Sequence, residues 1–125
     1  MRWLLAAALL LVAATARAEL PSASDAVIRQ ALRSGRPTVI DLGSRTCIPC
    51  KKMAPILENL SNEYRGRASV LFIDVHADDA AAQRFRVQMI PTQIFFDAKG
   101  REVKRHIGAM EKADIINYLK AAGLR

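Results

Sequence analysis

The stretch Thr46-Cys47-Ile48-Pro49-Cys50-Lys51-Lys52-Met53-Ala54-Pro55 decides the fold, and it holds the only two cysteines of the chain. The apolar, β-branched run before it, residues 37–43, is typical of a buried strand. After it, apolar residues recur at helical spacing: Met53, Ile56, Leu57 and Leu60. The C-x-x-C pair therefore lies where a strand ends and a helix begins. Unpaired backbone N–H groups and the positive end of the helix dipole at such a junction stabilise a thiolate, the reactive form of cysteine.

The two cysteines are expected to have different roles. Cys47, at the junction, is predicted to be the exposed nucleophile that attacks a partner's disulfide. Cys50, one turn into the helix, is predicted to be sheltered and to resolve the mixed disulfide. The alternatives are a structural zinc site, which would need His76 and His106 at spacings that match no known finger, and a structural disulfide. A disulfide that closes so short a loop constrains the unfolded chain little, so the redox interpretation is favoured.

Residues 1–18 are typical of a secretory signal peptide. Arg2 gives a positive start, residues 3–14 are largely apolar, and Ala16-Arg17-Ala18 is an A-x-A cleavage site. The apolar run is too short to favour a spanning helix, although an uncleaved anchor remains the alternative. The predicted organisation is a signal peptide at 1–18 and one domain at 19–125. We expect export, to the periplasm in a cell with two membranes, where thiols meet oxidising conditions.

The formal net charge of +7 comes from scattered basic residues, without a long run and without interleaved aromatic residues. Nucleic-acid binding is therefore not supported. Arg45, Lys51 and Lys52 flank the cysteines and could hold a thiolate or attract acidic partners, with a solvated basic face as the alternative.

The rest of the chain alternates between helix and strand patterns. Helices are predicted at about 24–34, from the cysteines to 64, at 78–86 and at 112–122, and strands at 38–42, 68–75, 93–96 and 102–107. This alternation predicts an α/β sheet covered on both faces, with the first strands parallel and the last pair antiparallel.

This order of elements, with these residues, resembles the thioredoxin family across essentially all of residues 19–125. Four features match in register: Asp41 six residues before Cys47, Pro55 five after Cys50, the Ile90-Pro91-Thr92 loop, and Gly108 beyond the hairpin. The resemblance implies the thioredoxin fold, with a central mixed sheet of about four strands flanked by helices. It also implies a redox-active Cys47–Cys50 disulfide with no further cofactor and no metal.

Asp41 and Pro91 have physical roles of their own. A carboxyl group among apolar strand residues is costly to bury, so Asp41 should titrate high and could take the proton of Cys50. An exposed aspartate at the strand end is the alternative. A cis bond before Pro91, which the resemblance implies, would lay backbone beside the sulfurs, where an extended partner could pair with the main chain around Ile90. An ordinary trans proline is the alternative there. The residues expected to contact substrate are Thr46, Ile48, Pro49, Ile90 and Pro91.

Several positions depart from the family pattern. Thr46 replaces the usual tryptophan and Ile48 the usual glycine, and the first strand of the full fold is predicted to be missing. The lysine that thioredoxins place near the buried acid is also missing, with Val70 as the nearest equivalent. The strongly oxidising exported relatives carry a histidine between the cysteines, whereas this chain has Ile48-Pro49. We therefore expect an exported disulfide reductase or exchange protein that acts on protein disulfides, is kept reduced by a membrane electron donor, and is a monomer.

Two other classes of function remain open. The thiolates could bind Cu(I) in a metal-handling module, with Met53 and Met89 as further soft ligands. The fold could instead act as an adaptor that binds partners by strand addition, without redox chemistry. His76 and His106 lie near predicted strand ends and are expected to be solvated rather than catalytic.

Overall fold

The computed structural model describes residues 19–125, which form a four-stranded sheet and four helices. Along the chain these are α1 (Asp25–Leu32), β1 (Thr38–Gly43), α2 (Ile48–Glu63), β2 (Ser69–Asp74), α3 (Asp79–Arg84), β3 (Thr92–Phe96), β4 (Glu102–Ile107) and α4 (Lys112–Ala121). The strand order is β2-β1-β3-β4, with β1 parallel to β2 and β3 antiparallel to both of its neighbours. This is the predicted mixed sheet. The signal peptide and cleavage site predicted for residues 1–18 lie outside the described residues.

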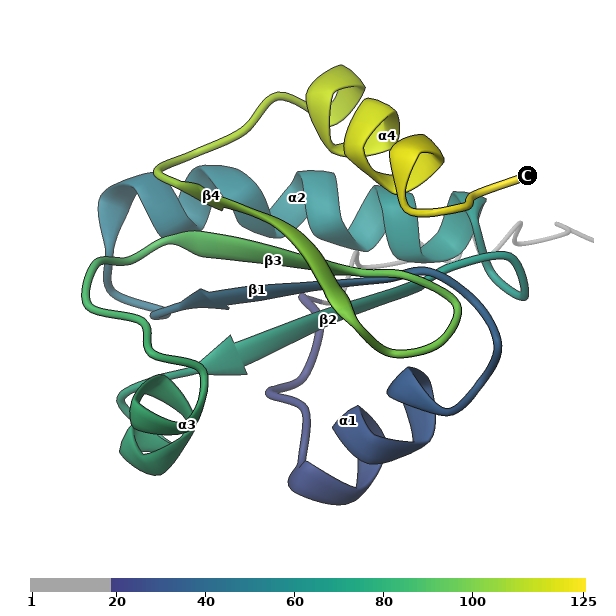
Figure 1. Cartoon of the computed structure of the whole chain (residues 1–125). Coiled ribbons are helices and arrows are strands. Elements are labelled where there is room, and N and C mark those ends of the chain that lie inside the picture. Colours follow the sequence, from purple (N-terminus) through teal and green to yellow (C-terminus); the bar gives the residue numbers. More distant parts are fainter. Residues whose placement is uncertain (1–18) are drawn as a thin grey trace, which may run out of the picture.

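Helices cover both faces of the sheet, α2 and α4 on one and α1 and α3 on the other (Figure 1). Successive side chains of a strand point to opposite faces, so each central strand contributes side chains to two hydrophobic cores. Val39 of β1 packs in the core that includes residues of α2 and α4, whereas its neighbour Ile40 packs in the core that includes residues of α1 and α3. Every residue of β1 is buried, because this strand lies inside the sheet and between two helical layers.

Local signals place the helix ends close to the predicted limits. The hydroxyl of Ser24 accepts a hydrogen bond from the amide of Val27 at the start of α1. The carboxylate of Asp78 accepts one from the amide of Ala81 at the start of α3. Such caps satisfy amides that the helix itself leaves unpaired.

The segment before α1 makes one bridge instead of a strand. Ser22 forms an isolated parallel bridge with Phe72, and the amide of Ala23 donates to the carbonyl of Phe72 at 2.7 Å. Arg45 anchors this segment, because its guanidinium donates to Glu19 at 3.0 Å and to the carbonyl of Leu20 at 2.6 Å. The same guanidinium lies 4.4 Å above the ring of Phe72. In the described residues, the first strand of the full fold is therefore reduced to a single anchored bridge.

The register of β2 corrects one sequence prediction. Val70 lies opposite Val39 in the parallel ladder, and it is Phe72 that lies opposite Asp41. Residues that are two positions apart in a strand point to the same face. Alternation alone therefore cannot distinguish registers that differ by two residues. The residue that occupies the lysine position beside the buried acid is therefore Phe72, which is also uncharged.

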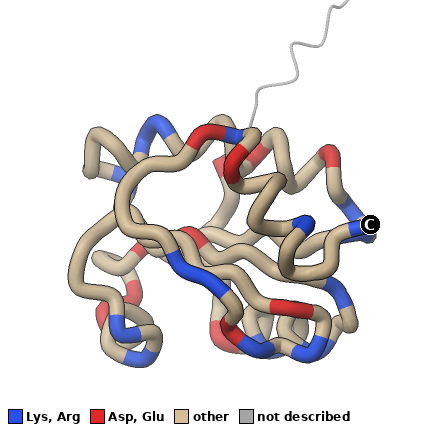
Figure 2. Tube along the Cα trace, turned by 45° about the horizontal axis from the view of Figure 1, so that its top comes forward, with Lys and Arg blue, Asp and Glu red and all other residues tan. Residues whose placement is uncertain are grey.

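Charges are mixed over the surface, as the scattered basic residues of the sequence indicate. Figure 2 shows basic and acidic positions interspersed along the described chain, with no face of a single sign. Some pairs join elements that are distant in sequence, such as Lys112 of α4 with Glu63 of α2 at 2.7 Å. No helix within residues 19–125 combines the length and apolar character needed to cross a membrane.

Candidate active site

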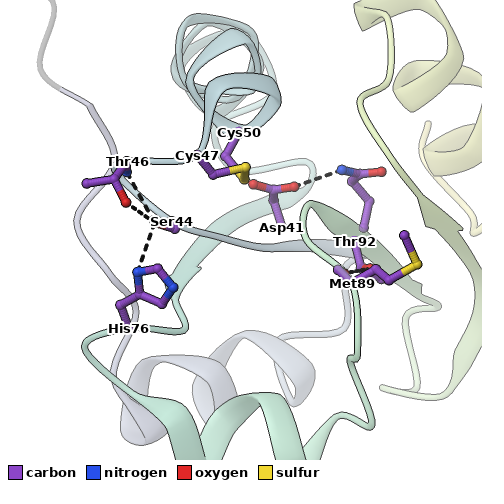
Figure 3. Close-up of a disulfide and its surroundings, with 9 residues drawn as sticks. Asp41, Ser44, Thr46, Cys47, Cys50, His76, Met89 and Thr92 are labelled. Atoms are coloured by element: carbon purple, nitrogen blue, oxygen red, sulfur yellow. Dashed lines mark hydrogen bonds between the residues drawn. A yellow bond between two sulfur atoms is a disulfide. The ribbon is translucent and has the colours of Figure 1, made fainter.

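The two cysteines lie where β1 passes into α2, as the sequence predicts. Cys47 occupies the N-cap position of α2, Pro49 lies in its first turn, and a disulfide joins Cys47 to Cys50 (Figure 3). Proline suits this turn because its missing N–H would have had no helical partner. The first turn carries no acidic residue, so no carboxylate offsets the positive end of the helix dipole.

The two sulfur-bearing residues differ in access to solvent. Cys47 is partly exposed, whereas Cys50 is only 4% exposed. Cys50 packs against Gly43 at the end of β1, where a Cβ atom would come within 3.2 Å of its Sγ. A partner arriving from solvent therefore meets Cys47 first.

Asp41 is fully buried, and its carboxyl group lies beside the Cys50 sulfur (Figure 3). The Cβ position of Gly43 would lie 3.4 Å from Asp41 Oδ2 as well as 3.2 Å from Cys50 Sγ. The two side chains thus approach the same point above the glycine. The predicted burial of Asp41 is confirmed, and the alternative of an exposed aspartate is wrong.

Burial raises the pKa of Asp41 from 3.8 to about 6, because the ionised carboxylate loses its hydration. A hydrogen bond from Gln93 Nε2 to Asp41 Oδ1, 2.8 Å long, favours the ionised form and limits the rise in the pKa. Among residues 19–125, Oδ2 has no hydrogen-bond partner. A carboxyl group with this pKa can exchange a proton near neutral pH, and Oδ2 is the oxygen left free to do so.

Gln93 and His106 belong to this environment, and sequence reasoning missed both. Gln93 is fully buried on β3, and its Oε1 is 3.0 Å from Nδ1 of His106 on β4. His106 was expected to be solvated rather than catalytic, and it is only partly exposed, with its Nδ1 hydrogen-bonded to Gln93. The signal that could have revealed Gln93 is its polar amide in a strand that is otherwise almost entirely apolar.

A second hydrogen-bonded group holds the turn before the cysteines. The buried hydroxyl of Ser44 lies 3.0 Å from Thr46 Oγ1 and 3.2 Å from His76 Nδ1, and it accepts a hydrogen bond from the amide of Thr46. Figure 3 shows this group on the other side of the cysteine turn from the Asp41 hydrogen bond. His76 itself is exposed, as expected.

Three of the five residues predicted to contact substrate lie in the cysteine turn, and the other two form the cis peptide before β3. Thr46, Ile48 and Pro49 are exposed, and the side chain of Ile48 is 72% exposed. The Ile90–Pro91 bond is cis, as the resemblance implies. The carbonyl of Pro91 accepts a hydrogen bond from the amide of Gly108 at 2.8 Å. Within residues 19–125 the backbone of Ile90 makes no hydrogen bond, so its main-chain groups are free.

The described residues offer few metal ligands near the cysteines. Met53 is fully buried, and its sulfur accepts a hydrogen bond from the amide of Met110 at 3.2 Å. Met89 is 63% exposed on the loop before the cis proline. Residues 19–125 hold no group of three or more His, Cys, Asp or Glu arranged to bind a metal ion. A Cu(I) site here could therefore use the two cysteine sulfurs but not Met53.

Comparisons with known proteins agree with this geometry. The model of the thioredoxin family matches residues 20–121. The chain is 37% identical to a thioredoxin of Mycolicibacterium smegmatis, over 78% of this chain and 88% of that protein. It is also 39% identical to a bifunctional thioredoxin reductase/thioredoxin of Mycobacterium leprae, over 70% of this chain but only 19% of that longer protein. Among solved structures, a mutant thioredoxin from Halobacterium salinarum matches with a TM-score of 0.72 and 22% identity, over 82% of this chain and 88% of that one.

Proposed function

This chain belongs to the thioredoxin family and is a thiol–disulfide oxidoreductase, and on that basis we propose that it is an exported protein-disulfide reductase in which Cys47 attacks and Cys50 resolves. The observation that carries the assignment of roles is the difference between the two cysteines. Cys47 is partly exposed at the N-cap of α2, while Cys50 is buried next to the Asp41 carboxyl group. Cys47 is the more open of the two to a protein substrate, and Cys50 has a proton acceptor beside it.

In the first step the thiolate of Cys47 attacks one sulfur of a substrate disulfide. The substrate S–S bond breaks, a disulfide forms between Cys47 and that sulfur, and the other substrate sulfur leaves as a thiolate that takes a proton from solvent. The amino end of α2 favours the Cys47 thiolate, and Lys51 and Lys52 add positive charge in its first turns.

In the second step Cys50 releases the substrate. The Cys50 thiol gives its proton to Asp41, and its sulfur attacks Cys47 Sγ, so that the Cys47–Cys50 disulfide forms again. The remaining substrate sulfur leaves as a thiolate, and the substrate has gained two electrons. With a pKa of about 6, Asp41 is mostly ionised at neutral pH and can accept this proton.

The exposed surface around the disulfide suits an extended segment of a protein substrate. The free main-chain groups of Ile90 can pair with such a segment as an added strand. The exposed side chains of Ile48 and Met89 supply apolar contacts near the reacting sulfur. Thr46 and Pro49 complete the exposed part of the proposed contact surface. Pro91 is itself buried, so it would act through the cis bond that sets the course of the loop.

Sequence patterns support the proposals of export and of a reducing direction of electron flow. Residues 1–18 carry the signal-peptide pattern, and the Ile48-Pro49 pair offers no side-chain donor to stabilise a thiolate. We expect a monomer that a membrane electron donor keeps reduced. A reduction potential of about −270 mV, measured against glutathione buffers, would support a reductase, whereas about −120 mV would make the protein an oxidant.

The roles of the cysteines are tested by trapping the mixed disulfide. Cys50→Ser, incubated with a disulfide-bonded protein such as insulin, should accumulate a covalent adduct that a reducing agent releases. Cys47→Ser should accumulate none, and both variants should lose turnover. An adduct formed by Cys47→Ser instead would reverse the assignment. Catalytic turnover in Cys47→Ser would overturn the mechanism.

Export is tested separately from the chemistry. The protein should be recovered from the fraction outside the cytoplasmic membrane with Glu19 as its first residue. Recovery of the intact leader in the membrane fraction would support an anchored protein, and recovery from the cytoplasm would overturn export.

A further inference from the structure

Three polar side chains form one row across the sheet, on the face that α2 and α4 cover. Asp41 on β1 lies opposite Gln93 on β3, and Gln93 lies opposite His106 on β4. Hydrogen bonds of 2.8 Å and 3.0 Å join the three in that order. On the other side of Asp41 the row ends in the apolar ring of Phe72 on β2. The row therefore connects the buried acid beside the disulfide with the edge strand of the sheet.

The two hydrogen bonds fix the direction of the Gln93 amide. Its Nε2 donates to Asp41 Oδ1, which leaves Oε1 to face His106. An amide oxygen can only accept, so Nδ1 of His106 is the donor in this pair. While Asp41 is ionised, turning the amide over would set its oxygen against the carboxylate and break that hydrogen bond inside a buried site, where an unpaired polar group is costly.

This direction makes the two oxygens of Asp41 unequal. Oδ1 already accepts a hydrogen bond from Gln93, which stabilises negative charge on this oxygen and makes it the less basic of the two. Oδ2 has no partner among residues 19–125, and it approaches Gly43 from the same side as Cys50 Sγ. The proton of Asp41 is accordingly placed on Oδ2, the oxygen beside the resolving sulfur.

We propose that Gln93 and His106 are positioning residues, which hold Asp41 so that it exchanges its proton through Oδ2 with the thiol of Cys50. The proposal rests on the proposed function, in which Cys50 resolves the mixed disulfide. In that step the S–H bond of Cys50 breaks, an O–H bond forms at Oδ2, and the sulfur forms its new bond to Cys47. Gln93 keeps Oδ1 out of this exchange, and His106 keeps Gln93 from turning.

Among residues 19–125, the charged groups near the row make no hydrogen bond to its three side chains. Arg45 lies over the ring of Phe72, Lys104 lies over the ring of Tyr118 on α4, and Lys51 lines the same pocket as Cys50. The elements that face Asp41 contribute Phe72 from β2, Gln93 from β3 and Cys50 from α2. Removing the amide of Gln93 leaves all these charges in place, so a change in the Asp41 titration reports the loss of the hydrogen bond.

The decisive measurement is the titration of Asp41 in the full chain, followed by the NMR shift of its carboxyl carbon in the oxidised protein. The wild-type midpoint should lie near pH 6. Gln93→Leu should raise the midpoint by about one pH unit, because a hydrogen bond to the charged form is lost. His106→Phe should raise it by less, and His106→Gln, whose amide can donate to Gln93, should bring it back towards the wild-type value. An unchanged midpoint in both Gln93→Leu and His106→Phe would overturn the proposal.

His76→Gln is the matched control, because this second histidine bonds to Ser44 instead. It should leave the Asp41 midpoint where it is, and an equal rise in this variant would overturn the proposal by showing a general effect of replacing a histidine. His106 is half-buried on the edge strand, so we expect His106→Phe to fold. If Gln93→Leu does not fold, the Asp41 midpoint in His106→Phe alone tests the proposal.

A kinetic measurement separates this proposal from the proposed function. In rapid mixing, Gln93→Leu should form the mixed disulfide as fast as the wild type but resolve it about twofold more slowly at pH 7, because a midpoint about one unit higher leaves about half of Asp41 ionised. The pH profile of resolution should move upward. Normal formation and resolution with an unmoved profile would overturn the positioning role and leave the proposed function intact. Failure of the wild-type protein to form any mixed disulfide would instead overturn the proposed function, and the NMR midpoints would still decide whether Gln93 and His106 control Asp41.

Discussion

Asp41 Oδ2 and Cys50 Sγ approach each other across Gly43, and the absence of a side chain at that glycine leaves room for both. A Cβ atom there would lie 3.4 Å from the oxygen, 3.2 Å from the sulfur and 3.3 Å from the Cβ atom of Cys50. Gly43 is not in the left-handed region, so a side chain at this position is opposed by space alone. The glycine thus determines how closely the proposed acid and the resolving thiol can approach.

Gly43→Ala should therefore slow resolution of the mixed disulfide more than its formation. The added methyl group pushes Cys50 away from Asp41 and overpacks the site, which should also lower the free energy of unfolding by about 1–3 kcal/mol. Rapid-mixing kinetics and urea unfolding measure the two effects. Gly35→Ala is the control, since φ is +76° at Gly35 and no atom lies within 4 Å of the added Cβ. Gly35→Ala should lower the free energy of unfolding without slowing either step. Equal slowing of formation and resolution of the mixed disulfide in Gly43→Ala would contradict the expectation.

Asp41→Asn should stabilise the oxidised protein at alkaline pH but not at acid pH. The folded-state pKa of Asp41, about 6, lies above the unfolded value of 3.8, so folding favours the protonated acid. The stability that Asp41 contributes is therefore fully present below about pH 4 and is lost as the pH rises through 6. The loss amounts to roughly 2–3 kcal/mol by pH 8, and asparagine, which does not ionise, avoids it.

Urea unfolding of both proteins at pH 3.5 and pH 8 measures this difference. The difference in the free energy of unfolding between the variant and the wild type should increase from the lower to the higher pH. A gap that stays constant with pH would mean that Asp41 does not ionise in the folded protein over this range.

The sequence predicted the part of the site that depends on local order. The C-x-x-C spacing, the strand before it and the helix after it place Cys47 outside and Cys50 inside, because exposure along the first helical turn follows from the helix itself. The buried acid was predictable for a similar reason, since Asp41 lies inside an apolar strand. In both cases the residues that determine whether the side chain is buried or exposed lie within ten positions along the chain.

The residues that were missed depend on pairing between distant strands. Gln93 contacts Asp41, and His106 contacts Gln93, only because β3 lies between β1 and β4 in one particular register. The prediction that Val70 occupies the lysine position beside Asp41 was wrong for the same reason, since registers two residues apart bury the same face. Phe72 occupies that position instead. Sequence periodicity assigns a side chain to a face of the sheet, but it does not select the partner across the strand.

Ile48→Ser should weaken binding of protein substrates without changing reactivity towards a small disulfide. The exposed isoleucine next to Cys47 can bury apolar area only against a partner large enough to cover it. Its loss should raise KM for a protein disulfide on the order of tenfold and leave the rate with oxidised glutathione unchanged. Val27→Ser is the control, because Val27 is also exposed, at 43%, but lies on α1 in the other helical layer. A similar rise in KM for Val27→Ser would show that exposed apolar residues contribute to binding of the protein substrate wherever they lie on the surface.

Arg45→Gln should lower stability while leaving the reactivity of Cys47 unchanged. The guanidinium of Arg45 is already engaged with Glu19, Leu20 and the ring of Phe72. Its loss should cost about 1–2 kcal/mol and expose the segment before α1 to proteases. Alkylation of reduced Cys47 over a range of pH gives the second readout. A slower reaction in the variant would mean that Arg45 acts on the thiolate instead.

Arg29→Gln serves as the comparison for Arg45→Gln, because it removes an exposed ion pair with Asp25 on the surface of α1. This change should alter the free energy of unfolding by no more than about 0.5 kcal/mol.

The anchoring of Glu19 by Arg45 has a practical consequence for fusion proteins and immobilisation. Glu19 and Cys50 line the same pocket, so a tag or linker joined directly to Glu19 would be attached at the edge of that pocket. The opposite terminus, Arg125, accepts a hydrogen bond from Arg67 beyond the far end of α2, a helix of 16 residues that spans about 24 Å. A carrier or surface attached at Arg125 lies at the end of α2 opposite the cysteines and leaves them facing outward (Figure 1).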